Sequence, residues 1–238
     1  MRASIKFIEH FNNYIERQPK RIMRFEEKIK DGKVAQDNLV SVYRKQFMIA
    51  FNTLAAMYSR GDEISSIQSQ FPALIVAMKK GWKDDKEIPA DKYQFDDYVL
   101  MLHMLSLGVL LDTTADEFED IVKVLDKSER KDALLEFLMS HKSQNRDSVT
   151  KIMYENPYKA LFEITQNANK NEVAYDLKAF LDKKWYSGMR NVYWYDNHKS
   201  RHDTFFGYWS FEVAAIAKIM DLNINQLKNN PYFPTDMI

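Results

Sequence analysis

Apolar side chains recur every three or four residues along most of this chain, and that spacing predicts helices from end to end. The clearest stripes run through 39–57, 95–111, 118–125 and 209–220. Apolar and polar residues nowhere alternate over more than about five positions, as a half-buried strand would require. Only six Gly and six Pro occur among 238 residues, which leaves few turns for a protein of many short strands. We therefore expect an all-α, multi-helical protein with no significant sheet.

Prolines suggest where some of these helices begin or bend. Pro19 separates a stripe over 5–15 from a second stripe over 22–29, which predicts two helices joined near this residue. Pro72 lies near the middle of the helical pattern over 64–82, so we expect a kink there or a break into two pieces.

Two further stretches predict their own local structure. Thr114 and Glu117 have the spacing of a capping box, which places a helix start just before Phe118. The stretch 205–220 is apolar nearly all round, which is the pattern of a buried central helix.

Several functional classes are excluded or disfavoured by what the sequence lacks. Because the chain has no Cys, it forms no disulfide, thiolate nucleophile or Cys-based zinc site, and it suits a reducing cytoplasm. The longest apolar stretch, 98–111, contains His103 and Ser106 and is too short to span a bilayer. The sequence carries no phosphate-binding loop, dinucleotide turn or nucleophile elbow. We expect a cytoplasmic protein that is not an enzyme, with no cofactor and no membrane partner.

Charge is distributed unevenly although the net charge is zero. Residues 1–83 hold fifteen Lys or Arg and eight acids (+7), residues 84–120 hold two and eleven (−9), and residues 121–238 hold seventeen and fifteen (+2). The acidic middle segment is either a solvated face or a docking face for a basic protein. The docking interpretation predicts partner contacts from eight residues: Asp84, Asp85, Glu87, Asp91, Asp112, Asp116, Glu119 and Asp120.

An aromatic stretch, Trp185 to Glu212, places ten aromatic side chains in twenty-eight residues. Core packing is the favoured interpretation, ahead of a stacking surface for nucleic acid and ahead of a metal site. A metal site would use His198 and His202, four residues apart, with Asp203 or Asp196 as a third ligand. If Glu212 is buried it needs a partner, and His198, Arg201 or a Tyr hydroxyl would serve.

The C-terminal part of the chain carries three motifs of a known family. They are Gly207-Tyr208-Trp209-Ser210-Phe211-Glu212, then Ala214-Ala215-x-Ala217-Lys218, and finally Asn-Pro-Tyr-x-Pro-x-Asp from Asn230 to Asp236. These residues resemble the C-terminal domain of the PoNi immunity proteins, which protect bacteria from PoNe-type DNase toxins. The helices up to about Leu125 are similar to the PoNi N-terminal domain.

The resemblance implies two helical subdomains, 1–125 and 126–238, packed into one compact body. It implies a cytoplasmic, non-enzymatic protein that binds a cognate DNase toxin and blocks it, and it leaves homodimerisation open. His198 and the motif residues Gly207, Tyr208, Trp209 and Glu212 are expected to be architectural. Charge, and not the resemblance, leads us to expect that the acidic segment meets the toxin's basic DNA-binding surface. Two alternatives stay open: a metal-dependent helical enzyme using His198, His202 and Asp203, and a regulator that binds nucleic acid directly through its basic N-terminal third.

Overall fold

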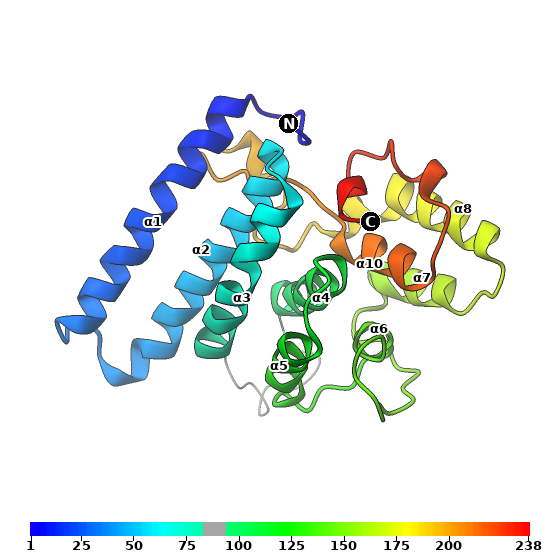
Figure 1. The fold of residues 1–238 in the computed structure, drawn as a ribbon, viewed down its shortest axis with the longest axis horizontal. Coiled ribbons are helices and arrows are strands. Elements are labelled where there is room, and N and C mark those ends of the chain that lie inside the picture. The colour runs from blue at the N-terminus through cyan, green and yellow to red at the C-terminus, as the bar shows by residue number, and fades with distance from the viewer. Residues whose placement is uncertain (83–93) are drawn as a thin grey trace. The chain divides into compact units, whose positions relative to one another are not determined.

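The computed structural model describes residues 1–82 and 94–238, and every regular element in those two ranges is a helix (Figure 1). The predicted all-α class is therefore confirmed. The chain divides into two compact units: Met1–Asp84 with Asp196–Gly207 form unit 1, and Asp85–Tyr195 with Tyr208–Ile238 form unit 2. None of the described helices is both long and apolar enough to cross a bilayer. The expected division near residue 125 remains a prediction about sequence domains.

Unit 1 contains three long helices, α1 (Ile8–Lys30), α2 (Leu39–Arg60) and α3 (Ile64–Gly81), and α2 packs against both of the others (Figure 1). The expected helix boundary at Pro19 is wrong, because Pro19 lies inside α1. Pro72 likewise lies inside α3, which is not broken into two. Each proline removes one backbone hydrogen bond, and we attribute the continuity of both helices to their packing on α2.

A short segment from late in the chain completes the core of unit 1. Phe205 lies with its ring 5.9 Å from that of Phe11 on α1, and its carbonyl accepts a 2.7 Å hydrogen bond from Nε2 of His10. The next carbonyl, that of Phe206, accepts a 2.7 Å hydrogen bond from Oγ of the buried Ser59 on α2. Residues 196–207 are thus an integral part of this unit although more than a hundred residues separate them from α3 in sequence.

Unit 2 is built around α4 (Phe95–Leu110), which is buried from Tyr98 to its end. It packs against α5 (Ala115–Asp126), α6 (Ala133–Met139) and α10 (Phe211–Ile219). The remaining helices are α7 (Glu155–Thr165), α8 (Lys170–Phe180), the π-helical turn η3 (Leu181–Trp185) and the short α9 (Tyr186–Gly188).

The last long helix is shorter than its apolar pattern predicts. We expected a helix over 205–220, but α10 begins at Phe211. Gly207 has a φ of 115°, which a helix excludes and which favours glycine. The backbone N–H of Ser210 donates a 2.8 Å hydrogen bond to the carbonyl of Tyr232 instead of continuing a helix backward. Residues 205–210 are therefore buried as an irregular segment.

Much of the aromatic stretch is buried in unit 2. The Trp185 ring is fully buried and lies 5.8 Å from Trp194 and 4.9 Å from Tyr232. Tyr186 stacks on Tyr232 at 5.4 Å and lies 5.0 Å from Tyr208. These rings bring the first family motif and the closing Asn-Pro-Tyr motif together in one aromatic cluster.

Trp209 provides a first test of this packing, since only 6% of it is exposed. We expect Trp209→Ala to lower the free energy of unfolding by about 3 kcal/mol, because truncating a buried aromatic leaves a cavity. Urea denaturation followed by circular dichroism measures the change. The exposed Tyr193→Ala, at 43% exposure, is a control that should cost less than about 1 kcal/mol. Equal losses in the two variants would contradict a packing role for Trp209.

Candidate functional site

Helix α5 carries the acidic residues that the sequence places at a partner surface. It begins with the predicted capping box: the backbone N–H of Glu117 donates to Oγ1 of Thr114 at 3.2 Å, and the backbone N–H of Thr114 donates to the Glu117 carboxylate at 3.0 Å. Its inward stripe is buried and includes Phe118 and Ile121. Gly108 on α4 lets α5 approach closely, because a Cβ there would lie 2.9 Å from the Phe118 ring. The orientation of α5 is therefore fixed at its start and along its buried face.

The outer face of α5 is acidic. The helix contains five acids and one Lys, a net charge of −4. Asp116, Glu119 and Asp120 are spaced three and four residues apart, so they share one side of the helix. Asp116 is exposed, whereas Glu119 and Asp120 are partly buried. We call these three residues the acidic face of α5.

Two lysines reduce the charge at the start of α5. Lys218 on α10 forms a 2.8 Å ion pair with Asp112, whose side chain is 68% exposed. Lys142 donates a 2.7 Å hydrogen bond to the carbonyl of Thr113, and burial lowers the pKa of its amino group. Asp112 is thus partly neutralised within the protein. The other four predicted contact residues, Asp84, Asp85, Glu87 and Asp91, lie outside the described residues.

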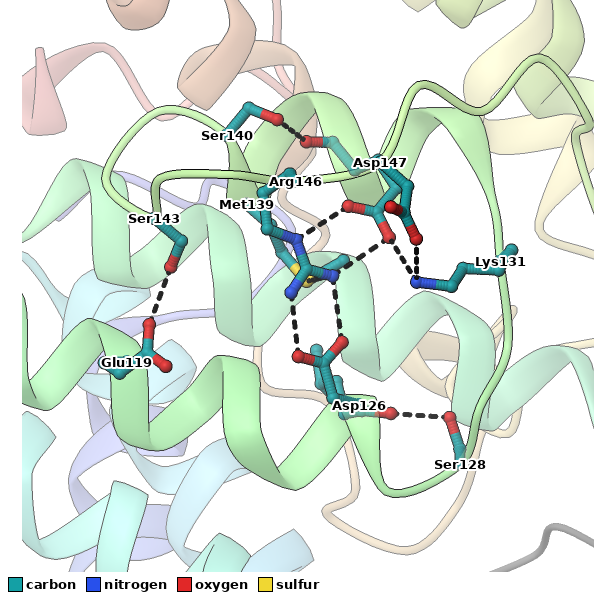
Figure 2. Close-up of polar contacts among 11 residues, drawn as sticks. Glu119, Asp126, Ser128, Lys131, Met139, Ser140, Ser143, Arg146 and Asp147 are labelled. Atoms are coloured by element: carbon teal, nitrogen blue, oxygen red, sulfur yellow. Dashed lines mark hydrogen bonds and ion pairs between the residues drawn. The ribbon is translucent and has the colours of Figure 1, made fainter.

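An arginine that the sequence analysis did not identify holds the loop after α6 in place (Figure 2). Arg146 donates to both carboxylate oxygens of Asp126 at 2.7 and 2.9 Å, and to both oxygens of Glu136 at 2.8 and 2.9 Å. Beside it, Lys131 pairs with Asp147 at 2.9 Å. These hydrogen bonds with two carboxylates raise the pKa of Arg146, which stays charged.

The same loop also reaches the acidic face of α5. Ser143 donates a 2.9 Å hydrogen bond from its Oγ to Glu119 (Figure 2). Glu119 therefore has a partner within the protein, and so has Asp126 at the end of α5. Within the described residues, no hydrogen bond or ion pair engages the Asp116 side chain. Arg146 stands next to Asp147 in the polar stretch HKSQNRDS, and such a stretch gives no local signal of which remote carboxylates it pairs with, so sequence reasoning could not assign Arg146 its role.

Glu212 lies at the centre of a buried polar cluster in unit 2. It is fully buried, and one carboxylate oxygen accepts hydrogen bonds from Nε1 of Trp185 at 2.6 Å and from the Tyr158 hydroxyl at 3.4 Å. Its other oxygen lies 3.4 Å from Nε2 of His103. Burial, and then the Glu212 charge, raise the pKa of Tyr158 well above its usual value, so this hydroxyl stays a donor.

These contacts correct part of the expectation for Glu212. A tyrosine hydroxyl, one of the three alternatives expected, is among its partners, whereas Trp185 and His103 were not expected. His198 and Arg201, the other two alternatives, belong to unit 1. His198 instead lies 6.3 Å from Phe205, ring to ring. Of the other motif residues, Tyr208 and Trp209 are buried in unit 2, and Gly207 is the last residue of unit 1.

The described residues include no group of three His, Asp or Glu side chains arranged to hold a metal ion. His202 and Asp203 are both exposed, and Asp203 is held by Arg17 and lies 3.6 Å from His10. The proposed set of His198, His202 and Asp203 is therefore not assembled as a metal site in this structure.

Comparison with solved structures places the architecture in a known class. The fold matches the crystal structure of protein PA2201 from Pseudomonas aeruginosa with a TM-score of 0.68, and the match covers 99% of this chain and 89% of that chain. The two sequences are 16% identical, so the likeness establishes the fold alone. A comparison with curated proteins finds no match. The protein is thus a multi-helical protein of the fold seen in PA2201.

The family follows from two further matches. Residues 2–123 match the N-terminal region of the PoNe immunity proteins (PoNi), and residues 130–237 match the C-terminal region of the same family. Together they cover nearly the whole chain, and the chain belongs to the PoNi family of PoNe immunity proteins. Membership implies neutralisation of a PoNe toxin, and immunity proteins of this kind are generally non-enzymatic.

Proposed function

We propose that this protein neutralises a cognate PoNe-type DNase toxin in the cytoplasm by placing the acidic face of α5 over the toxin's basic DNA-binding surface. The observation that carries the proposal is that α5, in a member of this family, presents Asp116, Glu119 and Asp120 on one side. A nuclease must offer cations to phosphates, and a carboxylate surface of matching shape competes for the same cations.

The way α5 is held supports a role in binding. Its start is capped, its inner stripe is buried, Ser143 holds Glu119, and Arg146 holds Asp126. A surface that is already ordered loses less conformational entropy when a partner binds, so more of the electrostatic attraction appears as affinity. In this proposal the buried motif residues around Trp209 and Glu212 are architectural, and the charged residues of 84–120 make the contact.

Charge reversal of the acidic face is the direct test. We expect Asp116→Lys with Asp120→Lys to slow association with the purified toxin about tenfold at low salt, because interfacial charge mainly governs the rate of encounter. The difference from wild type should shrink as salt is raised. Stopped-flow association kinetics across a salt series, together with a growth-protection assay against the toxin, provide the measurements. Glu119 is left unchanged because reversing it would also remove the hydrogen bond with Ser143.

A matched control exists on α7. Glu155 is exposed in the first turn of α7, as Asp116 is in α5, and Glu163 is exposed further along α7. Glu155→Lys with Glu163→Lys therefore makes the same change in net charge, and it also replaces the 3.7 Å ion pair between Glu155 and Lys159 by a like-charge pair. Equal slowing in both double variants would mean that only net charge matters, and unchanged kinetics in the Asp116/Asp120 variant would remove the acidic face from the interface.

A further inference from the structure

Unit 1 contains an apolar groove that the acidic-face proposal does not use. It is a cavity of about 750 Å³ with α2 as its floor and α1 and α3 as its walls. Six of its apolar lining residues are Ile22, Met23, Ile29, Leu54, Ala73 and Val76. Met23 on α1 and Val76 on α3 are 55% and 51% exposed and both line this groove, and contiguous exposed apolar surface often marks an interaction site.

The groove has the length and direction of a helix. Its lining runs along α1 from Gln18 to Lys30 and along α3 from Gln70 to Lys80, which is about 15–18 Å at the rise of an α-helix. In Figure 1, α1 and α3 run in the same direction on either side of the antiparallel α2. Three such helices have the arrangement of an up-down-up-down bundle that lacks one member, and small residues such as Ala73 leave room for another helix.

Charge distinguishes the two ends of the groove. Lys30 and Lys80 both line the end where α1 and α3 finish, and Tyr43, at the start of α2, lies there too. Glu26, one turn before Lys30 on α1, also lines the groove, so these three charged residues leave a net charge of +1 on this side. Gln18 and Gln70 line the opposite end. Acidic side chains in the first turn of a bound helix would meet the two lysines, and its N-terminal dipole would meet the C-terminal dipoles of α1 and α3. Such a helix runs antiparallel to α1 and α3.

A second copy of this chain is a poor occupant for the same surface. An isologous dimer through the groove would bring one concave surface against another and leave both unfilled. If the two grooves were aligned in parallel, the end with Lys30 and Lys80 in one copy would also lie against the same positively charged end in the other. A convex occupant, with an apolar stripe and an acidic first turn, complements both the shape and the charge.

We propose that the groove of unit 1 binds an amphipathic helix of a partner protein, with the apolar stripe of that helix on α2 and its acidic N-terminal turn at Lys30 and Lys80. The proposal is independent of the acidic face of α5, since it concerns other residues in the other unit. Its variants and those of the acidic face can fail or succeed separately.

The test uses synthetic helical peptides of about 16 residues and the full-length protein. The first peptide has a leucine stripe at helical spacing and three Glu in its first turn. The second carries the same Glu residues in its last turn, and the third has the stripe scrambled. Fluorescence anisotropy should show the first peptide binding about tenfold more tightly than either of the others. Binding of the first peptide no tighter than the scrambled one would overturn the proposal.

Variants of the protein identify the binding surface. Ala73→Glu should abolish binding, whereas Ser69→Glu, one turn away on α3 and outside the groove lining, should leave it intact. Lys80→Glu should lower the affinity for the first peptide about tenfold, whereas Lys79→Glu, at the neighbouring position outside the groove lining, should leave that affinity unchanged. Both Ala73 and Ser69 are exposed, so thermal unfolding should be similar in the two Glu variants. If Ala73→Glu still binds the first peptide, the groove is not the binding surface. If sedimentation velocity shows that the wild-type protein is a dimer and that Ala73→Glu is a monomer, the occupant is a second copy of the chain and the proposal is wrong.

Discussion

Trp185→Ala is expected to lower the free energy of unfolding by about 5 kcal/mol. Truncating a fully buried aromatic of this size costs roughly 3–5 kcal/mol through lost contacts and the cavity left behind. The substitution also removes the 2.6 Å hydrogen bond that the indole N–H donates to Glu212. Glu212 then keeps only the longer, 3.4 Å hydrogen bond from Tyr158 at this oxygen, and the lost hydrogen bond adds about 1–2 kcal/mol. Urea denaturation, or the loss of soluble protein if the variant does not fold, measures the result.

Milder variants separate the hydrogen bond from the packing. Trp185→Phe keeps an aromatic ring but removes the indole N–H that donates to Glu212. Trp194→Phe shortens the ring that stacks on Trp185, and Trp194 itself makes no hydrogen bond with Glu212 in this structure. We expect the first to cost more than the second. In the double variant Trp185→Phe with Glu212→Met, the total loss should be smaller than the sum of the two single losses, because the hydrogen bond between Trp185 and Glu212 is then lost only once. Tyr158 and His103 lose the carboxylate in Glu212→Met and in the double variant alike, so their contribution cancels in the comparison. Strict additivity would show that the hydrogen bond contributes nothing.

Arg146→Met is the second change with a large expected effect, about 3–5 kcal/mol in the free energy of unfolding. Arg146 is the closer of two cations at Glu136, whose side chain is only 5% exposed, and it also pairs with the more exposed Asp126. Removing it leaves the buried Glu136 charge with only the half-exposed Lys131 at 3.7 Å, and losing the main partner of a buried charge is costly at low dielectric. Urea denaturation gives the stability, and amide hydrogen exchange should show faster opening of the loop from Ser140 to Arg146.

Two companion variants give this expectation a sharp test. Lys131→Met removes a half-exposed cation from the same network, and we expect a loss below about 1 kcal/mol, as for surface pairs. Arg146→Met with Glu136→Leu removes both buried partners and should recover most of the stability. If Arg146→Met and Lys131→Met lower the free energy of unfolding by the same amount, solvent screens both ion pairs alike, and the expectation that the Arg146 pair contributes more is wrong.

Local patterns predicted local structure well. The apolar run over 95–111 became α4, and the capping box at Thr114 and Glu117 is present with both of its hydrogen bonds. The helix boundary predicted at Pro19 was wrong, because the packing of α1 along a neighbouring helix outweighs the one backbone hydrogen bond that proline removes. The irregular start before α10 could not be predicted either, since it depends on a hydrogen bond to Tyr232 that an apolar pattern does not encode.

The candidate sites show the same limit. The sequence located the charges of α5, but it gave no indication that Ser143 and Arg146 would hold two of them. Glu212 was expected to need a partner, yet Trp185 and His103 reach it from distant parts of the chain. The apolar stripe with Ile22 and Ile29 predicted a helix, but it gave no indication that these residues would line an open groove together with residues of α3. Pairings between remote residues depend on topology, which periodicity does not specify.

The segment 196–207, which completes the core of unit 1 with Phe205 and Phe206, limits how members of this family can exchange parts by recombination. A crossover between residues 82 and 195 would transfer α1, α2 and α3 while leaving Phe205 and Phe206 in the other parent. The hybrid would fold its first unit only if the new α1 and α2 accepted the old phenylalanines, as Phe11 on α1 and Ser59 on α2 do here. Each half of the gene is thereby constrained by the other, and toxin specificity is expected to diversify by substitution on the surface more readily than by shuffling of whole modules.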